Sequence, residues 1–304
     1  MKKNIFISIF LIIFIFNIRI VMDSVKYASS LFIEKIFIST FPFMILSDIL
    51  FYFDYHIFLK DSFVGRFISK IFNIDGSSAS VVIFSIFTSQ PNNSVYIKNM
   101  LDNNLIDIKS ANKLLCFTYF PSISFVIGTI GIFMLNSFKL GLFLYLNCLF
   151  NNILIGLYLR NEISISYGNK VLEKDTFLNT VKTSIIKSFN NLYIILGNII
   201  IFTIIIDLIS FLLNIDNLFI VLISVILEIT NGINNIILSD VSLISKLVLI
   251  SFALNFSGFS ILFQSFSILS NYKINIKKIL VIKLIFSIIS SFLFMLILPI
   301  LLQN

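Results

Sequence analysis

Long apolar segments recur along this chain, and they constrain its fold more than any other feature. Seven of them approach or exceed the length of about 20 residues that a helix needs to cross a bilayer. They cover residues 4–22, 36–53, 114–135, 138–159, 192–213, 247–270 and 279–303. Because backbone polar groups inside a bilayer must be satisfied within the segment, such spans are helical. The sequence therefore predicts an all-α polytopic membrane protein with about seven transmembrane helices.

The composition agrees with this class and excludes others. Of the 304 residues, 58% are hydrophobic and 12% are charged, which is far from a soluble domain. The net charge is +7, but the basic residues do not gather on a face that could follow phosphates, so we expect no nucleic-acid partner. The lipid bilayer is the expected environment, and the excess of basic residues should mark cytoplasmic loops.

Few residues are available for metal binding or catalysis. Cys116 and Cys148 both lie in apolar runs, and His56 is the only histidine, so neither a disulfide framework nor a multi-histidine metal site is expected. The sequence contains no serine, histidine and acid in a plausible triad and no glycine-rich phosphate loop. We therefore expect a protein that is not an enzyme and that has no cofactor or metal.

The N-terminal segment resembles a secretory signal in its first residues. Lys2 and Lys3 precede an apolar run from Ile5 to Phe16. No small-residue cleavage site follows, and the chain continues as further spans. We therefore expect residues 1–35 to form an N-terminal transmembrane helix and a connector.

The distribution of lysine and arginine predicts the orientation. If residues 54–76, 91–113, 160–187 and 271–278 lie in the cytoplasm together with the N-terminus, that side holds most of the 22 basic residues. The C-terminus then lies outside. Lys283, one turn into the last span, is expected to extend its ammonium to the cytoplasmic face.

Two apolar segments are too short to cross the bilayer. Residues 77–87 and 217–227 cover about half its thickness, and each runs into polar, turn-forming sequence beginning at Thr88 or Glu228. Half-length apolar segments that end in such breaks are typical of re-entrant hairpins. The hairpins are expected near residues 77–112 and 217–246.

The order of spans and breaks repeats. Residues 36–159 form a first repeat, residues 160–191 a cytoplasmic linker and residues 192–304 a second repeat. Each repeat also contains an interrupted span, at 120–124 and at 256–260. The charge assignment makes the repeats inverted, an architecture of transporters whose substrate site lies where the breaks face each other. The alternative is a chance similarity of hydropathy.

The polar residues at these four breaks are the candidate site for a substrate or ion. They supply hydroxyls, amides, one carboxylate and free backbone groups, and a helix that begins at a break directs N–H groups at an anion. The alternative for each Pro or Gly alone is a simple helix kink. The candidates are Thr88, Ser89, Gln90, Asn92, Asn93, Ser122, Ser124, Glu228, Thr230, Asn231, Gly232, Ser257, Gly258, Ser260 and Gln264.

Ionisable residues inside apolar sequence are costly and often functional. Glu228 is the strongest candidate because it lies at the tip of the second hairpin; the alternative is a carboxylate solvated near the outer surface. Asp48 and Asp207 are possible sites for a coupling ion, proton or sodium, although each lies near a span end where solvation would explain it equally well.

Two further segments have a polar face. Residues 59–72 alternate basic residues with phenylalanine and isoleucine, which predicts an amphipathic helix on the cytoplasmic membrane surface. Residues 94–113 hold three lysines and two aspartates, and we expect a solvated helical arm of the first hairpin.

Several of these motifs, in this order, resemble one family over roughly residues 36–300. They are Phe41–Phe43, Ser47–Leu50, Thr88–Pro91, Ile127–Gly131, Glu228–Gly232, Phe256–Ser260 and Gln264. The chain is similar here to the sporulation integral membrane proteins of the YlbJ type, also called stage V sporulation protein V. These proteins are built on the nucleoside-recognition (Gate) domain. This chain departs from the family pattern at Ser89, where glycine is usual, at Asp48, where glutamate is expected, and at Asn92 and Asn93, which replace small residues.

The resemblance implies a function and a location. It implies a transporter in the mother-cell-derived outer forespore membrane of an endospore-forming bacterium, moving the small anionic solute dipicolinate from the mother cell toward the spore. One alternative is a transporter of a nucleoside or another small polar solute. A second alternative is a non-transporting membrane scaffold for spore cortex or coat assembly. The sequence does not predict an oligomeric state.

Overall fold

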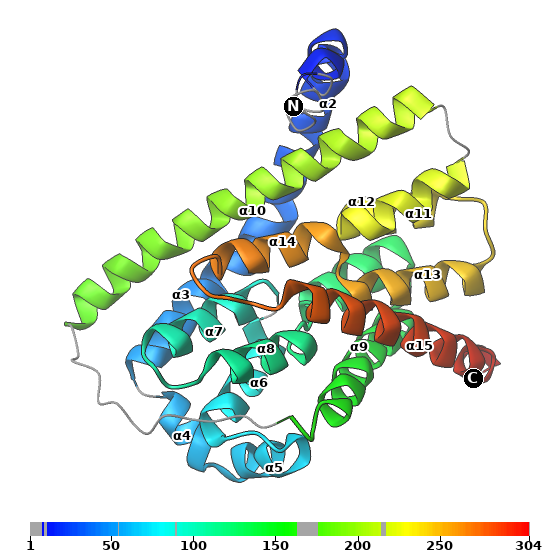
Figure 1. The fold of residues 1–304 in the computed structure, drawn as a ribbon. Helices are drawn as coiled ribbons and strands as arrows, with labels where there is room; N and C mark the ends of the chain where they lie inside the picture. Colours follow the sequence, from blue (N-terminus) through cyan, green and yellow to red (C-terminus); the bar gives the residue numbers. More distant parts are fainter. Residues whose placement is uncertain are drawn as a thin grey trace.

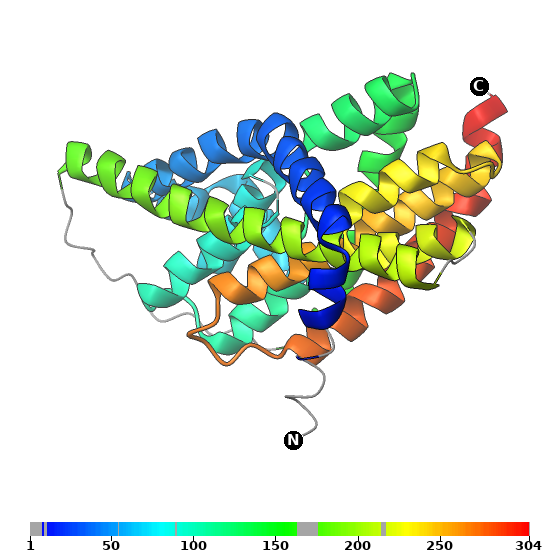
Figure 2. The same cartoon turned by 90° about the horizontal axis from the view of Figure 1, so that it is seen from above.

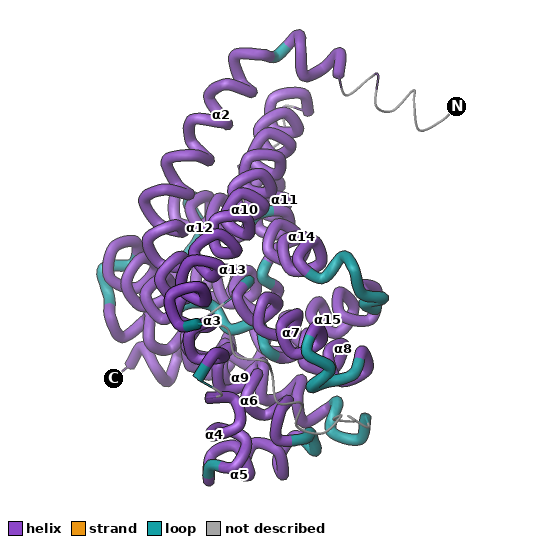
Figure 3. Tube along the Cα trace, turned by 90° about the vertical axis from the view of Figure 1, so that its left-hand side faces the viewer, coloured by secondary structure: helices purple, strands orange, loops and turns teal. Residues whose placement is uncertain are grey.

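The computed structural model describes residues 8, 11–53, 55–88, 90–162, 176–213 and 217–303. Every regular element in this part of the chain is a helix, as Figure 3 shows. The predicted all-α class is confirmed. Within the described ranges, four helices are long and apolar enough to cross a membrane: Phe138–Tyr158, Phe177–Leu212, Leu243–Ile268 and Ile276–Leu301. A fifth span is added if Phe63–Phe72 and Gly76–Ile86, bent by 104°, are counted as one.

The N-terminal helices do not form two separate spans in the described residues. Helix α2 (Ile18–Leu31), the π-helix η1 (Phe32–Phe37) and helix α3 (Ile38–Tyr52) follow one another without a loop, because Phe32 and Ile38 keep helical backbone angles. The predicted spans 4–22 and 36–53 are thus joined by helix, and the first lies partly outside the described residues. The predicted count of seven spans is not confirmed.

The two halves of the remaining chain share part of their order of elements. The first half has α4 (Tyr55–Asp61), α5 (Phe63–Phe72), α6 (Gly76–Thr88), α7 (Asn92–Asp102), α8 (Ile108–Phe117), η2 (Ser124–Met134) and α9 (Phe138–Tyr158). The second has α10 (Phe177–Leu213), α11 (Asn217–Leu227), α12 (Ile229–Leu238), α13 (Leu243–Phe256), α14 (Gly258–Ile268) and α15 (Ile276–Gln303). Each half contains a helical hairpin, then a broken helix, then a long helix: α6–α7, α8–η2 and α9, matched by α11–α12, α13–α14 and α15.

Helix α10 crosses the whole molecule. Its 37 residues correspond to about 55 Å at 1.5 Å per residue, which exceeds the thickness of the hydrocarbon core of a bilayer. Figures 1 and 2 show it lying across the other helices, with α2, α3 and α14 among its packing partners. It begins at Phe177, so the second half of the expected linker 160–191 is helical.

Segments predicted to be cytoplasmic meet at one end of the molecule. The ammonium of Lys113 on α8 donates to three backbone carbonyls, those of Phe72 (3.0 Å), Asn73 (3.1 Å) and Glu162 (2.8 Å). Lys278 at the start of α15 forms an ion pair with Glu162 at 2.6 Å. These contacts join parts of the segments 54–76, 91–113, 160–187 and 271–278, as a common side of the membrane requires.

The expectation of a solvated arm at residues 94–113 is wrong. One face of α7 is buried through Tyr96, Ile97 and Met100, and Lys113 on α8 is 1% exposed. The polar residues misled the prediction because Lys113 satisfies carbonyl groups inside the protein instead of facing water. Helix α5 agrees better with its prediction, since Phe63 and Phe67 are exposed and stacked on each other.

The interior between α9, α13 and α15 contains polar groups. The Oδ1 atom of Asn147 accepts hydrogen bonds from Ser251 (2.8 Å), Asn255 (2.8 Å) and Ser290 (3.2 Å). Two turns earlier on α15, Lys283 is 1% exposed, and its Nζ lies 4.3 Å from the ring centroid of Tyr119. The expectation that Lys283 reaches the cytoplasmic face is therefore wrong, because its position on α15 faces the bundle interior.

Candidate functional site

The four breaks predicted from the sequence coincide with four helix ends. Helix α6 ends at Thr88 and α7 begins at Asn92; α8 ends at Phe117 and η2 begins at Ser124. In the second half, Glu228 separates α11 from α12, and Ser257 separates α13 from α14. Pro, Gly and polar residues mark each position, and such residues interrupt helices for steric reasons or through competing hydrogen bonds.

Within each half, the hairpin tip touches the broken helix. In the first half, the backbone N–H of Gln90 donates to the carbonyl of Phe120 at 3.0 Å. In the second half, a Cβ atom on Gly258 would lie only 3.2 Å from the backbone nitrogen of Ile229, and Gly258 also has φ of +66°. Glycine is needed there for both reasons, the close approach and the left-handed backbone.

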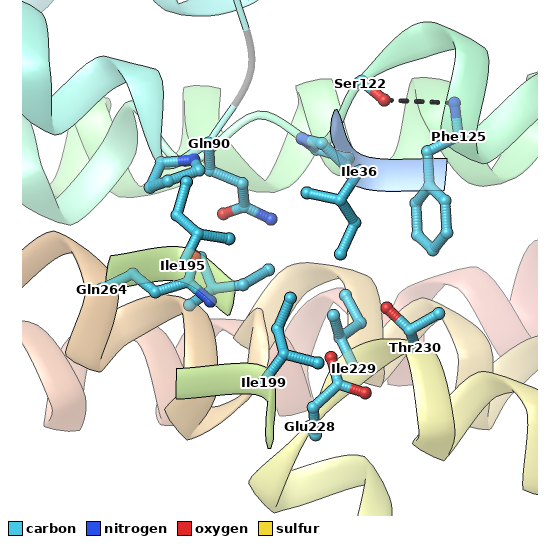
Figure 4. A pocket seen from close by; sticks show the side chains of 13 residues that line it. Ile36, Gln90, Ser122, Phe125, Ile195, Ile199, Glu228, Ile229, Thr230 and Gln264 are labelled. Carbon is cyan, nitrogen blue, oxygen red and sulfur yellow. Dashed lines mark hydrogen bonds between the residues drawn. The ribbon is translucent and has the colours of Figure 1, made fainter. Parts of the chain in front are cut away.

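Three of the four breaks line one cavity, drawn in Figure 4, and helix α14, which follows the fourth break, contributes Ile261 and Gln264. The cavity volume is about 80 Å³, which is small beside the roughly 300–1,000 Å³ of typical ligand pockets. In Figure 4, Gln90 and Glu228 lie at opposite ends of the cavity, with isoleucine side chains between them. The lining residues are Ile36, Gln90, Pro91, Pro121, Ser122, Phe125, Ile195, Ile199, Glu228, Ile229, Thr230, Ile261 and Gln264.

Glu228 caps helix α12 with its own side chain. It is 2% exposed, and its Oε2 atom accepts a hydrogen bond from the backbone N–H of Asn231 at 2.7 Å. The hydroxyl and backbone N–H of Thr230 also approach the carboxylate. The alternative of a solvated surface carboxylate is therefore excluded, and Glu228 is a buried acid held by the first turn of a helix.

The helix N-termini at this cavity differ in what they offer a ligand. At η2 the Ser122 hydroxyl accepts from the N–H of Phe125 at 3.1 Å, and at α12 Glu228 accepts from Asn231, so both ends hold internal caps. Helix α7 begins at Asn92 directly after the lining residue Pro91, whose own side chain provides no cap. Each of these three helix ends lies at the cavity, where a helix N-terminus favours an anionic group.

Five predicted residues line the cavity: Gln90, Ser122, Glu228, Thr230 and Gln264. Gln90 is half-buried, and within the described part of the chain its Oε1 atom has no hydrogen-bond partner. Gln264 is 2% exposed and donates to the Ser260 hydroxyl at 3.3 Å. These two amides add adaptable polar groups to a mostly apolar lining.

The other predicted residues lie around the cavity without lining it. Asn92, Asn93, Asn231, Gly232, Ser257, Gly258 and Ser260 are buried in the adjoining helix ends. Asn93 donates to Thr118 at 3.2 Å, and Asn231 donates to Thr203 at 3.1 Å. Ser124 is exposed. Asp207 lies in a separate cavity.

Three predictions fall outside what the structure describes. Ser89 is not among the described residues, and for Thr88 and Asp48 only the helical backbone is described. Sequence reasoning missed the apolar lining, which includes Ile36 from η1 and Ile195 and Ile199 from α10. Isoleucine is abundant in the whole chain, so no local signal distinguishes these three.

Comparison with known proteins adds an independent finding. No known family model matches the chain, and no solved structure matches it. The chain is 25% identical over 302 residues to the sporulation integral membrane protein YlbJ of Bacillus subtilis (strain 168), covering 86% of this chain and 74% of that protein. This similarity confirms the resemblance inferred from the motifs. The chain is therefore a relative of the YlbJ-type sporulation integral membrane proteins.

Proposed function

We propose that this protein is a solute transporter whose binding site is the cavity at the helix breaks. The observation that carries the proposal is the convergence of three breaks, at 90–91, 121–122 and 228–230, on one cavity that α14, the helix after the fourth break, also lines. Paired broken elements from repeated halves form the substrate sites of many secondary transporters. A protein that served only as a scaffold would have no need for buried polar breaks, which cost stability unless they are satisfied.

The small volume of the cavity is consistent with a closed state. About 80 Å³ is well below the roughly 300–1,000 Å³ of typical ligand pockets, so a whole solute would enter only if the two halves moved apart. Within each half, the hairpin tip and the broken helix are in contact. We therefore expect each half to move as a unit and the cavity to open between the halves.

Dipicolinate is the substrate that we propose. Similarity to a sporulation protein supports a role in the sporulating cell, with the outer forespore membrane as the location and transport from the mother cell toward the spore as the direction. The N-terminus of α7, which follows the lining residue Pro91, would receive one carboxylate, and Phe125 offers an apolar face to a planar ring. Glu228 would have to be protonated or paired with a cation while a dianion occupies the cavity.

A neutral polar solute such as a nucleoside is the second candidate. The observation that favours it is the charge of the lining, which among the described residues contains one carboxylate, that of Glu228, and no lysine or arginine. Carboxylate and amide groups suit the hydroxyl and amide groups of a nucleoside. The two candidates differ in charge: dipicolinate would add two negative charges to the cavity beside Glu228, whereas a nucleoside would add none.

Uptake by inside-out vesicles that contain the protein tests the proposal, with labelled dipicolinate and labelled uridine measured side by side. We expect protein-dependent accumulation of dipicolinate that is lost in Glu228→Ala, which removes the acceptor of the Asn231 N–H, with normal amounts of that variant in the membrane. Asp240→Asn removes an exposed acid after α12 and should transport normally. Accumulation of uridine alone would favour the second candidate. Accumulation of neither solute would favour the scaffold alternative, and normal transport by Glu228→Ala would refute the site assignment.

A further inference from the structure

A second cavity lies between α2, α10 and α12, beside the first. It has a volume of about 230 Å³ and is lined by Tyr27, Ile206, Asp207, Asn231, Asn234 and Asn235. Only Ile206 has a purely apolar side chain. A concentration of carboxylate, amide and phenol groups in a helical membrane protein is costly unless it binds something polar.

Asp207 supplies a negative charge without a cationic partner. Its Oδ2 atom accepts a hydrogen bond from the Ser24 hydroxyl at 2.5 Å, and no lysine, arginine or histidine of the described ranges forms an ion pair with it. Asp207 is half-buried on α10. An ionised carboxylate in this position attracts a cation more strongly than one in water, because the surroundings screen it less.

The asparagines of this cavity use their nitrogen atoms within the protein. The Nδ2 atom of Asn231 donates to Thr203 at 3.1 Å, and that of Asn235 donates to Ser224 at 3.1 Å. Among the described residues, none donates to the Oδ1 atom of either side chain. Asn231 is only 6% exposed and lines the cavity, so a ligand or water that enters the cavity can satisfy its carbonyl oxygen.

We propose that this cavity is a sodium-binding site. Carboxylate, amide and phenol oxygens are hard ligands that suit alkali and alkaline-earth cations rather than transition metals. A single carboxylate matches one positive charge, whereas calcium sites use several carboxylates. The described residues contain no cluster of three or more His, Cys, Asp or Glu side chains that could hold a metal ion, which agrees with a monovalent occupant.

Asn231 connects the sodium site to the solute cavity. Its side chain lines the cavity of Asp207, while its backbone N–H donates to Glu228 Oε2 at 2.7 Å. An ion bound to the Asn231 carbonyl would hold the first turn of α12 and the capping geometry of Glu228. Sodium binding would in this way be coupled to solute binding. The coupling rests on the proposed transport function, whereas the sodium site itself does not.

The thermal stability of the purified full chain in detergent tests the binding without any solute. Sodium, potassium and choline chloride are compared at constant ionic strength. A ligand that binds the folded state raises its stability, and we expect sodium to raise the unfolding midpoint by roughly 2–4 °C over choline. Asp207→Asn should lose this increase and Asp240→Asn should keep it. If Asp207→Asn does not fold, Asn234→Ala removes one lining oxygen without breaking a described hydrogen bond and should require several-fold more sodium.

Three results would overturn the assignment. They are the absence of a sodium effect on the unaltered protein, an equal effect in Asp207→Asn, and an equal effect of potassium, which would indicate a site without selectivity for sodium. Because no solute is added, the result is independent of the transport assay. A sodium effect in a protein that accumulates no solute would support the sodium site and refute the proposed function. Transport without a sodium effect would support the proposed function and refute the sodium site.

Discussion

Replacing Gly232 with alanine should force apart the two helices of the second hairpin. A Cβ atom at this position would lie 2.5 Å from the Cα and 2.8 Å from the backbone nitrogen of Val225. These are backbone atoms of α11, so they cannot rotate away as a flexible side chain could. Inserting an atom into such a packed contact costs about 1–3 kcal/mol.

Gly197 provides the matched control for this substitution. It lies within α10, and a Cβ atom there would meet no atom within 4 Å. Alanine gains about 0.8–1 kcal/mol over glycine in either helix, so this gain cancels when the two variants are compared. The difference between them then reports the crowding at Val225 alone, which corresponds to roughly 2–12 °C in the unfolding midpoint.

The measurement is the unfolding midpoint of each variant in the same detergent, followed by size-exclusion chromatography after heating. Gly197→Ala should unfold at or slightly above the midpoint of the unaltered protein, and Gly232→Ala should unfold below Gly197→Ala by the stated difference. Equal midpoints would show that α11 and α12 are not in backbone contact, and would refute the packing on which the position of Glu228 depends.

Three further substitutions test other contacts by the same measurement. Burial lowers the pKa of the Lys113 ammonium from its ordinary value of 10.5. Between the lowered pKa and 10.5 the unfolded chain therefore binds more protons than the folded chain, and the free energy of unfolding should rise with pH in that window. Lys113→Met should abolish this rise. At lower pH, Lys113→Met should also cost about 1–3 kcal/mol because three carbonyls lose their donor, and a change no larger than that of exposed Lys109→Met would contradict this. Asn147→Leu should lower the free energy of unfolding by about 2–4 kcal/mol, because the buried groups that donate to Asn147 lose their acceptor. The control Asn198→Leu removes only a bond to its own helix and should lower it by less than 1 kcal/mol. Lys283→Met replaces a buried ammonium that has no ion pair among the described residues and should leave the midpoint unchanged or raised; a large decrease would reveal a partner for the charge.

The positions of the breaks could be predicted from sequence because the residues that cause them act locally. Pro91, Pro121 and Gly258 interrupt helices through their own backbone constraints, and Glu228 caps the helix that follows it. Their convergence on one cavity followed from the assumption of a repeat, which the common order of helices supports. The fold class followed from hydropathy alone.

The remaining features depend on packing that hydropathy does not report. The helix continues through Phe32–Phe37 although a charged segment interrupts the apolar pattern there. Lys113 and Lys283 look like surface residues in the sequence, yet the bundle encloses both, one with backbone carbonyls and one against Tyr119. The isoleucines from α10 that line the cavity became identifiable only once the path of that helix was known.

The bond between Gln90 and Phe120 joins two main-chain atoms, and this affects how the first hairpin tolerates change. Any residue except proline at position 90 can supply the same N–H, and every residue at position 120 supplies the same carbonyl. Substitutions of the side chains at this tip therefore leave that link between hairpin and broken helix in place. Alanine at position 90 or 120 removes a side chain but keeps the bond, and only Gln90→Pro would remove the bond itself.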